Sequence, residues 1–265
     1  MMDEKILELK GLKQYFSINR KNIVKAVDDV SFSINKGEFF ALVGESGSGK
    51  STISRSIVGI NKITDGEIIY NGINIADYKV YKKEKNNISK SIQLIFQDTT
   101  SSLNSRMTIE AIIAEPLIIQ KSYKNKKEIL NKVNEMLKLV GLDTSYAKKY
   151  PYDCSGGQRQ RINIARSLVT NPDFIIADEP IASLDVSMQL EIIEIFKKLK
   201  RERNLTCLFI SHDLDMVRYI SDRIGVLRKG KLIEVGTTEE IYMKPQHDYT
   251  KSLIGSILKP YSKSE

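Results

Sequence analysis

The sequence predicts an α/β fold with a mainly parallel sheet, and three observations support this prediction. A short apolar run at 38–43 is followed by glycines and then, from Lys50, by helix-forming residues. Apolar residues recur at helical spacing between 107 and 170, which predicts an inserted helical subdomain at about 100–170. Beyond it, strands alternate with helices, as they do in parallel sheets. These later strand-like runs cover 173–177, 205–211 and 223–227.

The first part of the chain is predicted to be mostly strand. Residues 5–10 alternate between apolar and polar side chains, 24–34 form a second β-like stretch, and 38–43 end at a glycine. Two polar tracts, 81–90 and 121–127, are predicted to be surface connections.

Two helices are predicted from the periodicity of their apolar residues. The first lies near 129–140, and Gly141 supplies its stop signal. The second covers 186–203. Its expected apolar stripe consists of Val186, Leu190, Ile193, Phe196 and Leu199.

The composition excludes several classes of protein. With 265 residues, 41% of them hydrophobic, the chain can bury a core without disulfides, and its only cysteines are Cys154 and Cys207. We therefore expect a reducing, intracellular compartment. No window holds the about eighteen apolar residues that a membrane-spanning helix needs, and the first ten residues lack the apolar core of a secretion signal. The net charge of +8 is spread among acids, which favours ordinary solvated faces.

The strongest local pattern is a phosphate-binding loop between a predicted strand and a predicted helix. Glycines let backbone N–H groups turn toward a phosphate, and the positive end of the following helix points at the same anion. Lys50 is expected to neutralise the β- and γ-phosphates of a nucleotide, and the Ser51 hydroxyl to bind Mg²⁺. The loop comprises Gly44, Glu45, Ser46, Gly47, Ser48, Gly49, Lys50, Ser51 and Thr52.

A second pattern is an apolar strand that ends in two adjacent carboxylates, Asp178 and Glu179. Open α/β sheets place ligand chemistry at such strand ends. Successive side chains of a strand point in opposite directions, so the two acids can take different roles. We assign Asp178 to Mg²⁺, directly or through water, and Glu179 to the general base that activates the attacking water.

A third pattern is a small-residue turn that opens an amphipathic helix and forms a second helix N-terminus suited to an anion. It comprises Ser155, Gly156, Gly157 and Gln158. Taken alone, this turn is more often an ordinary helix cap. One nucleotide in a single chain has no obvious need for both this turn and the phosphate loop.

Together these features resemble the nucleotide-binding subunits of ABC transporters, in which the same motifs occur in the same order. The resemblance covers essentially the whole chain. It implies a single nucleotide-binding domain over 1–265 with a phosphate-loop NTPase core, an N-terminal antiparallel β portion and a family-specific tail at about 238–265. In that family, the Ser-Gly-Gly-Gln turn completes the γ-phosphate site of the partner subunit in a head-to-tail dimer, which explains the second anion site.

The resemblance also implies roles for further residues. Gln97 is similar to the glutamine that contacts Mg²⁺ and the attacking water. His212 resembles the histidine that contacts the γ-phosphate, and Asp185 matches a loop that communicates across the dimer. Phe16 fits the aromatic residue that stacks on adenine, with Tyr15 as the alternative.

A narrower resemblance links the chain to the ATPases of oligopeptide, dipeptide and nickel importers. The segments that carry it are 42–50, 96–98 with 102–104, 114–117 and 245–251. The chain departs from the usual pattern at Cys154, Thr99, Ser105 and Asp248. Cys154 stands beside a predicted helix start, which lowers the pKa of a thiol, although no redox role is expected. Cys207 is expected to be a buried small hydrophobe.

The resemblance therefore implies an ATPase that couples dimer closure on ATP and Mg²⁺ to uptake of oligopeptides, dipeptides or nickel. The implied partners are two transmembrane permease subunits, a second ATPase subunit that is a paralogue or identical, and an extracytoplasmic substrate-binding protein, with no nucleic acid. The chain would act at the cytoplasmic face of the membrane. Two alternatives remain open, namely a nucleic-acid-associated ATPase of the same superfamily and an exporter subunit.

Overall fold

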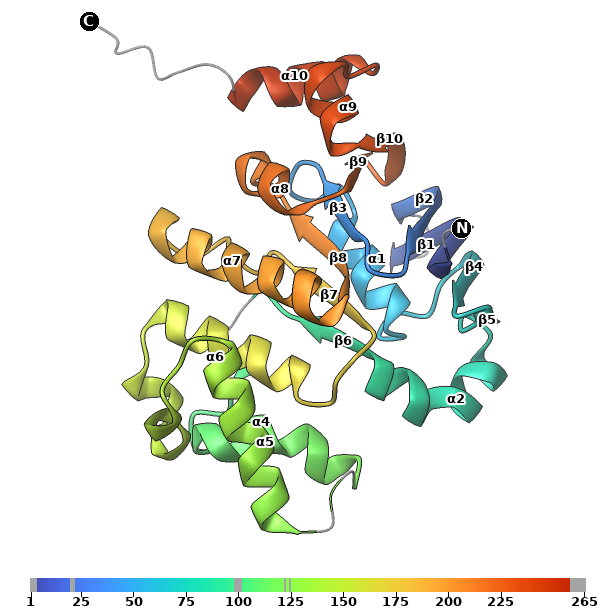
Figure 1. Cartoon of the computed structure of the whole chain (residues 1–265). Coiled ribbons are helices and arrows are strands. Elements are labelled where there is room, and N and C mark those ends of the chain that lie inside the picture. The colour runs from blue at the N-terminus through green and yellow to red at the C-terminus, as the bar shows by residue number, and fades with distance from the viewer. Residues whose placement is uncertain (1–3, 20–21, 98–101, 122, 124, 258–265) are drawn as a thin grey trace, which may run out of the picture. The chain divides into compact units, whose positions relative to one another are not determined.

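The computed structural model describes the chain except residues 1–3, 20–21, 98–101, 122, 124 and 258–265. Contacts divide it into two compact units. Unit 1 comprises Met1–Tyr81 and Thr206–Glu265, and unit 2 comprises Lys82–Leu205. Figure 1 labels the elements of both, and each unit is described by itself below.

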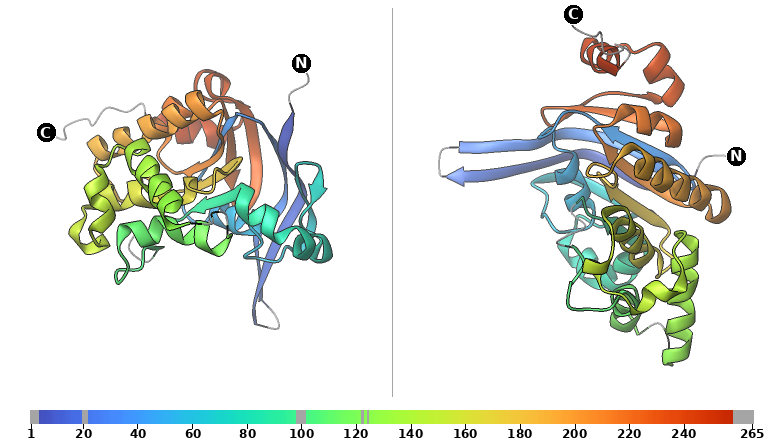
Figure 2. Two further views of the ribbon diagram at one scale, coloured as in Figure 1. Left: turned by 60° about the horizontal axis from the view of Figure 1, so that its bottom comes forward. Right: turned by 90° about the vertical axis from the view of Figure 1, so that its left-hand side faces the viewer.

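Unit 1 contains an antiparallel sheet with the strand order β2-β1-β4-β5. Its strands are β1 (Lys5–Asn19), β2 (Asn22–Asn35), β4 (Asp65–Tyr70) and β5 (Ile73–Asn74). β1 and β2 run side by side as a long hairpin, which is seen best in the right-hand view of Figure 2. The N-terminal antiparallel β portion is thus confirmed, and its first two strands are longer than the alternation predicts.

Unit 1 also contains mainly parallel strands. β3 (Phe39–Val43) lies between β8 (Thr206–Ser211) and β9 (Arg223–Arg228) and is parallel to both, while β10 (Lys231–Thr237) is antiparallel to β9. Every residue of β3 and β8 is buried. Their continuous apolar runs fit strands that are covered on both faces.

Several helices lie wholly within the described residues of unit 1. They are α1 (Lys50–Ile57), α8 (Leu214–Ile220), α9 (Thr238–Met243) and α10 (Asp248–Ile257). α1 begins at Lys50, as predicted. α9 opens with a capping box in which Thr237 and Glu240 bond reciprocally. Cys207 in β8 is fully buried, as expected.

Unit 2 contains the parallel pair β6 (Ile92–Ile95) and β7 (Phe174–Asp178). Its chain begins within the helix α2 (Tyr78–Ser91). Because this helix covers 81–90, the prediction of a surface connection there is wrong. The tract is a helix because its lysines and glutamate are good helix formers. Among its residues only Ile88 is buried, which explains why apolar periodicity did not reveal it.

The block between these strands is helical, as predicted from its spacing. Its α-helices are α4 (Ile109–Ile119), α5 (Lys126–Leu139) and α6 (Gly156–Leu168), and its 3₁₀ turns are η1 (Thr144–Lys148) and η2 (Pro151–Asp153). Lys126 and Lys127 begin α5, so the predicted connection at 121–127 is too long by those two residues. Val133, Met136 and Leu137 of α5 are fully buried.

α7 (Val186–Arg203) has the predicted bounds but a shorter buried face. Ile193, Phe196 and Leu199 are buried, whereas Val186 and Leu190 are 64% and 45% exposed. Periodicity identifies the apolar face of a helix but not where along its length the packing begins. In α7, packing begins near Ile192.

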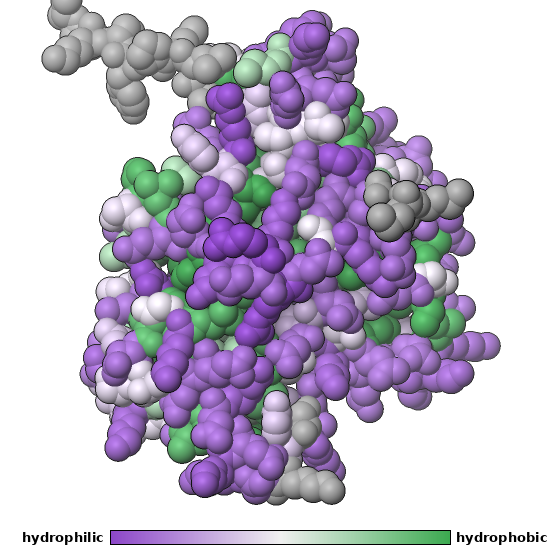
Figure 3. Space-filling view, in the orientation of Figure 1, coloured by the Kyte–Doolittle hydropathy of each residue, from purple (hydrophilic) through white to green (hydrophobic). Residues whose placement is uncertain are grey.

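The surface is mainly hydrophilic on the face shown in Figure 3, with hydrophobic residues in separate groups. In the part of the chain that the structure describes, no helix is both long enough and apolar enough to cross a bilayer.

Candidate nucleotide-binding site

The phosphate loop lies in unit 1 between β3 and α1, and two of its glycines are required by close backbone contacts. A Cβ atom on Gly44 would lie 2.1 Å from the Leu227 carbonyl oxygen, and one on Gly49 would lie 2.3 Å from that of Ala26. Both glycines have positive φ, of 149° and 109°. Any side chain at these positions would force the backbone of the loop to move.

Polar groups line the inside of this loop. The buried ammonium of Lys50 donates to the carbonyl oxygens of Gly44 at 2.7 Å and Glu45 at 2.9 Å. Ser48 is buried, and its Oγ has no hydrogen-bond partner among the described residues. A buried hydroxyl without a partner costs about 1–3 kcal/mol. This orphaned atom fits a cradle that an anionic ligand completes.

The other loop residues surround this cradle. Glu45, Ser46 and Gly47 are exposed, while Ser51 and Thr52 are half-buried in the first turn of α1. The predicted loop residues therefore form one continuous turn and helix start, as the motif requires.

The register of β3 and β8 brings a further predicted residue to the same sheet edge. Val43 pairs with Ser211 in parallel, so Gly44 and His212 both follow the carboxyl ends of adjacent strands. His212 is exposed. Its turn is fixed by Ser211 Oγ, which accepts a hydrogen bond of 2.9 Å from the Asp213 amide.

Phe16 and Tyr15 differ in what their side chains do. The Tyr15 hydroxyl donates to Asp28, and the Lys25 ammonium lies 5.2 Å from the centre of its ring. The Asp28 carboxylate raises the pKa of the Tyr15 hydroxyl through this hydrogen bond. Phe16 is 40% exposed and pairs with Val24, two residues before the Ala26 carbonyl that contacts Gly49. Phe16 is therefore the more exposed of the two aromatic residues, whereas Tyr15 is half-buried and its hydroxyl is engaged by Asp28.

In unit 2, the parallel pairing of Ile95 with Ala177 sets Gln97 and Glu179 at the same end of β6 and β7. Gln97 Nε2 donates to Glu179 Oε2 at 2.8 Å. Asp178, the last residue of β7, is 4% exposed. Glu179 has a left-handed φ of 48°, a conformation that costs a non-glycine residue about 1–3 kcal/mol and often occurs at functional sites.

Asp185 caps the N-terminus of α7. Its carboxylate accepts hydrogen bonds from Ser187 Oγ at 2.6 Å and from the Met188 amide at 3.0 Å. These hydrogen bonds, that of Ser187 first, lower the pKa of Asp185. The carboxylate therefore stays charged at the helix end.

The turn at Ser155 is built as a capping box at the N-terminus of α6. Ser155 Oγ accepts from the Gln158 amide at 3.3 Å, and Gln158 Oε1 accepts from the Ser155 amide at 2.9 Å. Gln158 Nε2 also donates to the Tyr146 hydroxyl at 2.9 Å. Ser155 is exposed, so the turn can meet a ligand or a partner.

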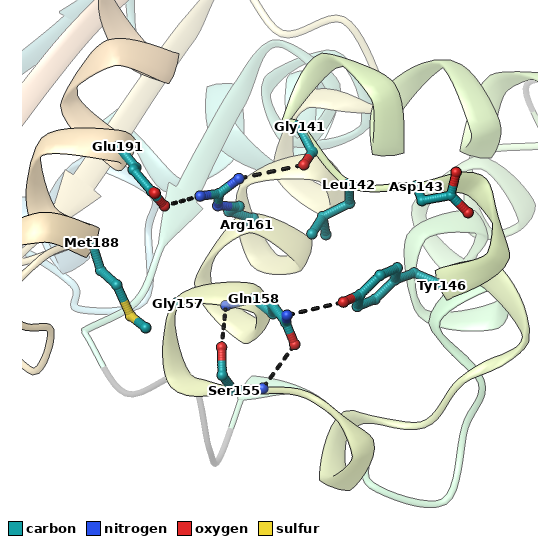
Figure 4. Close-up of a pocket in the computed structure, with 10 residues that line it drawn as sticks. All are labelled: Gly141, Leu142, Asp143, Tyr146, Ser155, Gly157, Gln158, Arg161, Met188 and Glu191. Carbon is teal, nitrogen blue, oxygen red and sulfur yellow. Dashed lines mark hydrogen bonds and ion pairs between the residues drawn. The ribbon is translucent and has the colours of Figure 1, made fainter.

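These residues line a pocket of about 250 Å³ in unit 2, shown in Figure 4. Arg161 pairs with Glu191 on its wall and also donates to the Gly141 carbonyl oxygen. The remaining lining residues are Leu142, Asp143, Tyr146, Ser155, Gly157, Gln158 and Met188.

Cys154, just before this turn, is buried. Burial raises the pKa of its thiol. The expectation of a lowered pKa is wrong, because removal from water opposes the thiolate more than the charges of Lys149 and Arg159 favour it.

The residues predicted to bind the metal each offer an oxygen donor. They are Ser51, Gln97 and Asp178. Mg²⁺ prefers oxygen ligands and is usually held by one or two carboxylates together with substrate phosphates and water. Within the described ranges, no cluster of three or more His, Cys, Asp or Glu side chains could hold a metal ion by itself. Each of these three side chains, taken by itself, therefore carries an oxygen donor that suits Mg²⁺.

Two residues escaped the sequence-based predictions. Tyr146 contacts Gln158 from η1, and no sequence signal marks it. Tyr249 accepts a hydrogen bond of 3.3 Å from the Glu45 amide of the phosphate loop. It lies within the 245–251 tract, whose sequence indicates only a family resemblance and no contact with the loop.

Comparisons with known proteins extend these observations. A family model described as ABC transporter matches residues 27–182. The chain is 53% identical to the oligopeptide transport ATP-binding protein OppF of Bacillus subtilis, covering 98% of this chain and 84% of that protein. It is 47% identical to the oligopeptide transport ATP-binding protein AmiF of Streptococcus pneumoniae, covering 98% and 83%.

Solved structures agree with the fold. The ATP-binding cassette MJ0796, a dimer in a post-hydrolysis state bound to ADP and Pi, superposes with a TM-score of 0.80 at 30% identity, covering 88% of this chain and 98% of that one. CbiO1 from Clostridium perfringens, part of the ABC transporter complex cbiONQ, gives a TM-score of 0.79 at 28% identity, covering 91% and 92%.

Proposed function

The chain belongs to the ABC transporter family and is an ATPase, and from this premise we propose that it is the ATP-binding subunit of an oligopeptide importer. The observation that carries the proposal is its 53% identity to an oligopeptide transport ATP-binding protein over 98% of the chain. The same identity favours peptides over nickel as cargo. It also disfavours an exporter or a nucleic-acid-associated ATPase.

The phosphate loop would hold the nucleotide through its backbone N–H groups and Lys50. The orphaned Ser48 hydroxyl and the helix start at Lys50 support this role. The exposed ring of Phe16 would stack on the adenine. His212, which follows the strand adjacent to β3, would contact the γ-phosphate.

Glu179 would act as the general base on the attacking water, and its hydrogen bond to Gln97 would orient the carboxylate. Ser51, Gln97 and Asp178 would hold Mg²⁺. When bound, this ion would neutralise charge on the phosphates. Because the Gln97 amide nitrogen donates to Glu179, the oxygen donor that Gln97 would offer is its side-chain carbonyl.

The turn at Ser155–Gln158 would complete the site of a second ATPase subunit, with Asp185 at the interface. The exposed Ser155 at a helix N-terminus supports this role. The second subunit would be a paralogue or an identical chain. The assembly would also contain two permease subunits and an extracytoplasmic binding protein, with the ATPases at the cytoplasmic face of the membrane.

Purification of the intact complex tests this proposal. The chain should co-purify with two permease subunits and, in proteoliposomes, support ATP-dependent uptake of a radiolabelled oligopeptide but not of nickel. A complex containing Glu179→Gln should show no uptake. Uptake of nickel alone, or purification with nucleic acid in place of permeases, would contradict the proposal.

A further inference from the structure

The C-terminal segment of unit 1, which we define as residues 238–257, contacts the phosphate loop. Tyr249, near the start of α10, is 8% exposed, and its hydroxyl accepts a hydrogen bond of 3.3 Å from the Glu45 amide. The two residues are 204 positions apart in the chain. A residue outside the nucleotide-binding motifs therefore contacts the loop directly.

The contact falls on a peptide unit that is also bonded from its other side. The Gly44 carbonyl and the Glu45 amide belong to one planar peptide, in which C=O and N–H point in opposite directions. Lys50 Nζ donates to this carbonyl at 2.7 Å, and Tyr249 accepts from the amide. The Gly44–Glu45 peptide is thus held between the Lys50 ammonium and the Tyr249 hydroxyl.

The end of β9 contacts both Gly44 and Tyr249. The Leu227 carbonyl oxygen approaches Gly44 so closely that no Cβ fits there. The next residue, Arg228, places its guanidinium 4.6 Å from the centre of the Tyr249 ring. A cation at this distance from a ring attracts it and keeps it in place.

The segment that carries Tyr249 is itself anchored to β10. The Glu234 carboxylate accepts hydrogen bonds from the amides of Gln246 at 2.7 Å and His247 at 3.0 Å. His247 Nδ1 then accepts from the Tyr249 amide at 3.0 Å. Hydrogen bonds therefore connect Glu234 of β10 to the segment that carries Tyr249.

We propose that Tyr249 is a positioning residue of the phosphate loop, through which the C-terminal segment sets the affinity for ATP. The hydroxyl fixes the Gly44–Glu45 peptide and thereby the position of the Lys50 ammonium, which binds phosphate in the proposed function on which this inference rests. Burial raises the pKa of Tyr249, so the hydroxyl remains a neutral acceptor at physiological pH. Tyr249 acts through the loop and does not touch the phosphates.

The test compares two phenylalanine variants of the full chain. Tyr249→Phe removes the hydroxyl that meets the phosphate loop. Tyr242→Phe is the matched control, because Tyr242 lies in the same C-terminal segment, donates to the Leu214 carbonyl and has the Arg218 guanidinium 5.3 Å from the centre of its ring. Binding of a fluorescent ATP analogue and the melting temperature are measured for both.

Tyr249→Phe should weaken binding of the analogue about two- to tenfold, the range expected for one hydrogen bond, while Tyr242→Phe binds like the wild type. In the transporter complex, the same variant should raise KM for ATP by that factor and leave kcat unchanged. Unchanged or tighter binding by Tyr249→Phe, equal weakening in both variants, or a loss confined to kcat would overturn the inference. Absence of binding by the wild-type chain would instead refute the proposed nucleotide site.

A second variant keeps the inference testable if Tyr249→Phe fails to fold. Glu234→Ala removes the anchor of the segment and leaves Tyr249 in place. It should weaken binding of the analogue in the same direction and speed tryptic cleavage after Lys251. Faster cleavage with unchanged affinity would contradict the proposal.

Discussion

Gln97 Nε2 lies 2.8 Å from Glu179 Oε2, although the two residues are 82 positions apart in the chain. Parallel pairing of β6 with β7 creates this contact, because it aligns the ends of the two strands. The glutamine that follows one strand thus orients the carboxylate that follows its neighbour.

Glu179→Gln should reduce the rate of ATP hydrolysis by about 10²- to 10⁴-fold, the contribution of a general base. ATP binding should remain, because the new carboxamide still offers an oxygen to Gln97. The ATP-bound dimer should then persist and elute early in size-exclusion chromatography.

The matched control is Glu194→Gln, which changes an exposed carboxylate on α7 that pairs with Lys197. Its hydrolysis rate should match that of the wild type. Normal turnover by Glu179→Gln would remove Glu179 from the role of base.

Ser155→Arg should leave the affinity of the monomer for ATP unchanged and suppress the ATP-dependent dimer. The arginine would project from an exposed turn that we place against the nucleotide of the second subunit. Dimerisation is measured by sedimentation in the Glu179→Gln background, where ATP is not consumed.

Ser155→Ala separates this steric effect from the loss of the helix cap. Both variants lose the Ser155 acceptor and with it about 1 kcal/mol of stability, so their melting temperatures should fall alike. Only the arginine should abolish the dimer. Weaker ATP binding by monomeric Ser155→Arg would argue against a role in the opposite subunit.

Most of the candidate site could be predicted because its residues lie in short motifs next to recognisable strands. The phosphate loop, Asp178 and the Ser155 turn each combine a local pattern with a strand or helix end. The contacts between motifs could not be predicted in this way. Those of Tyr146 with Gln158 and of Tyr249 with Glu45 depend on tertiary packing, which leaves no periodic signal.

In the fold too, elements with a local sequence pattern can be predicted, whereas features that depend on tertiary packing cannot. β3 and β8 could be predicted because both are short, continuous apolar runs. α2 cannot be predicted from periodicity, because a helix with one buried residue has almost no apolar period. The exposed Val186 at the start of α7 shows that a correct period does not tell how much of a helix is covered.

Tyr146→Phe should weaken ATP-dependent dimerisation about two- to tenfold, because Gln158 loses one of the hydrogen bonds that orient its carboxamide. ATP affinity of the monomer should not change. Tyr152→Phe is the control, since Tyr152 is 68% exposed on η2. Dimerisation of Tyr146→Phe equal to that of the control would show that Tyr146 does not support the turn.

The hydrogen bonds by which the Glu234 carboxylate anchors the C-terminal segment should weaken at acid pH. Burial by itself raises the pKa of Glu234, but the hydrogen bonds from the amides of Gln246 and His247 oppose it, and the pKa lies below its ordinary value of 4.5. Because the folded-state pKa is lowered, the unfolded chain takes up the proton first. The contribution of Glu234 to stability is therefore complete above pH 4.5 and is lost as the pH falls through the folded-state pKa.

The melting temperatures of the wild type and Glu234→Gln, measured from pH 7 to pH 3, check this expectation. The difference between the two proteins should be constant near neutrality and shrink below about pH 4.5, because protonation makes the wild type resemble the variant. Other carboxyl groups titrate in both proteins and cancel in the difference. Glu239→Gln, an exposed neighbour on α9, should show no such change. A difference that stays constant down to pH 3 would mean that the charge of Glu234 does not hold the segment.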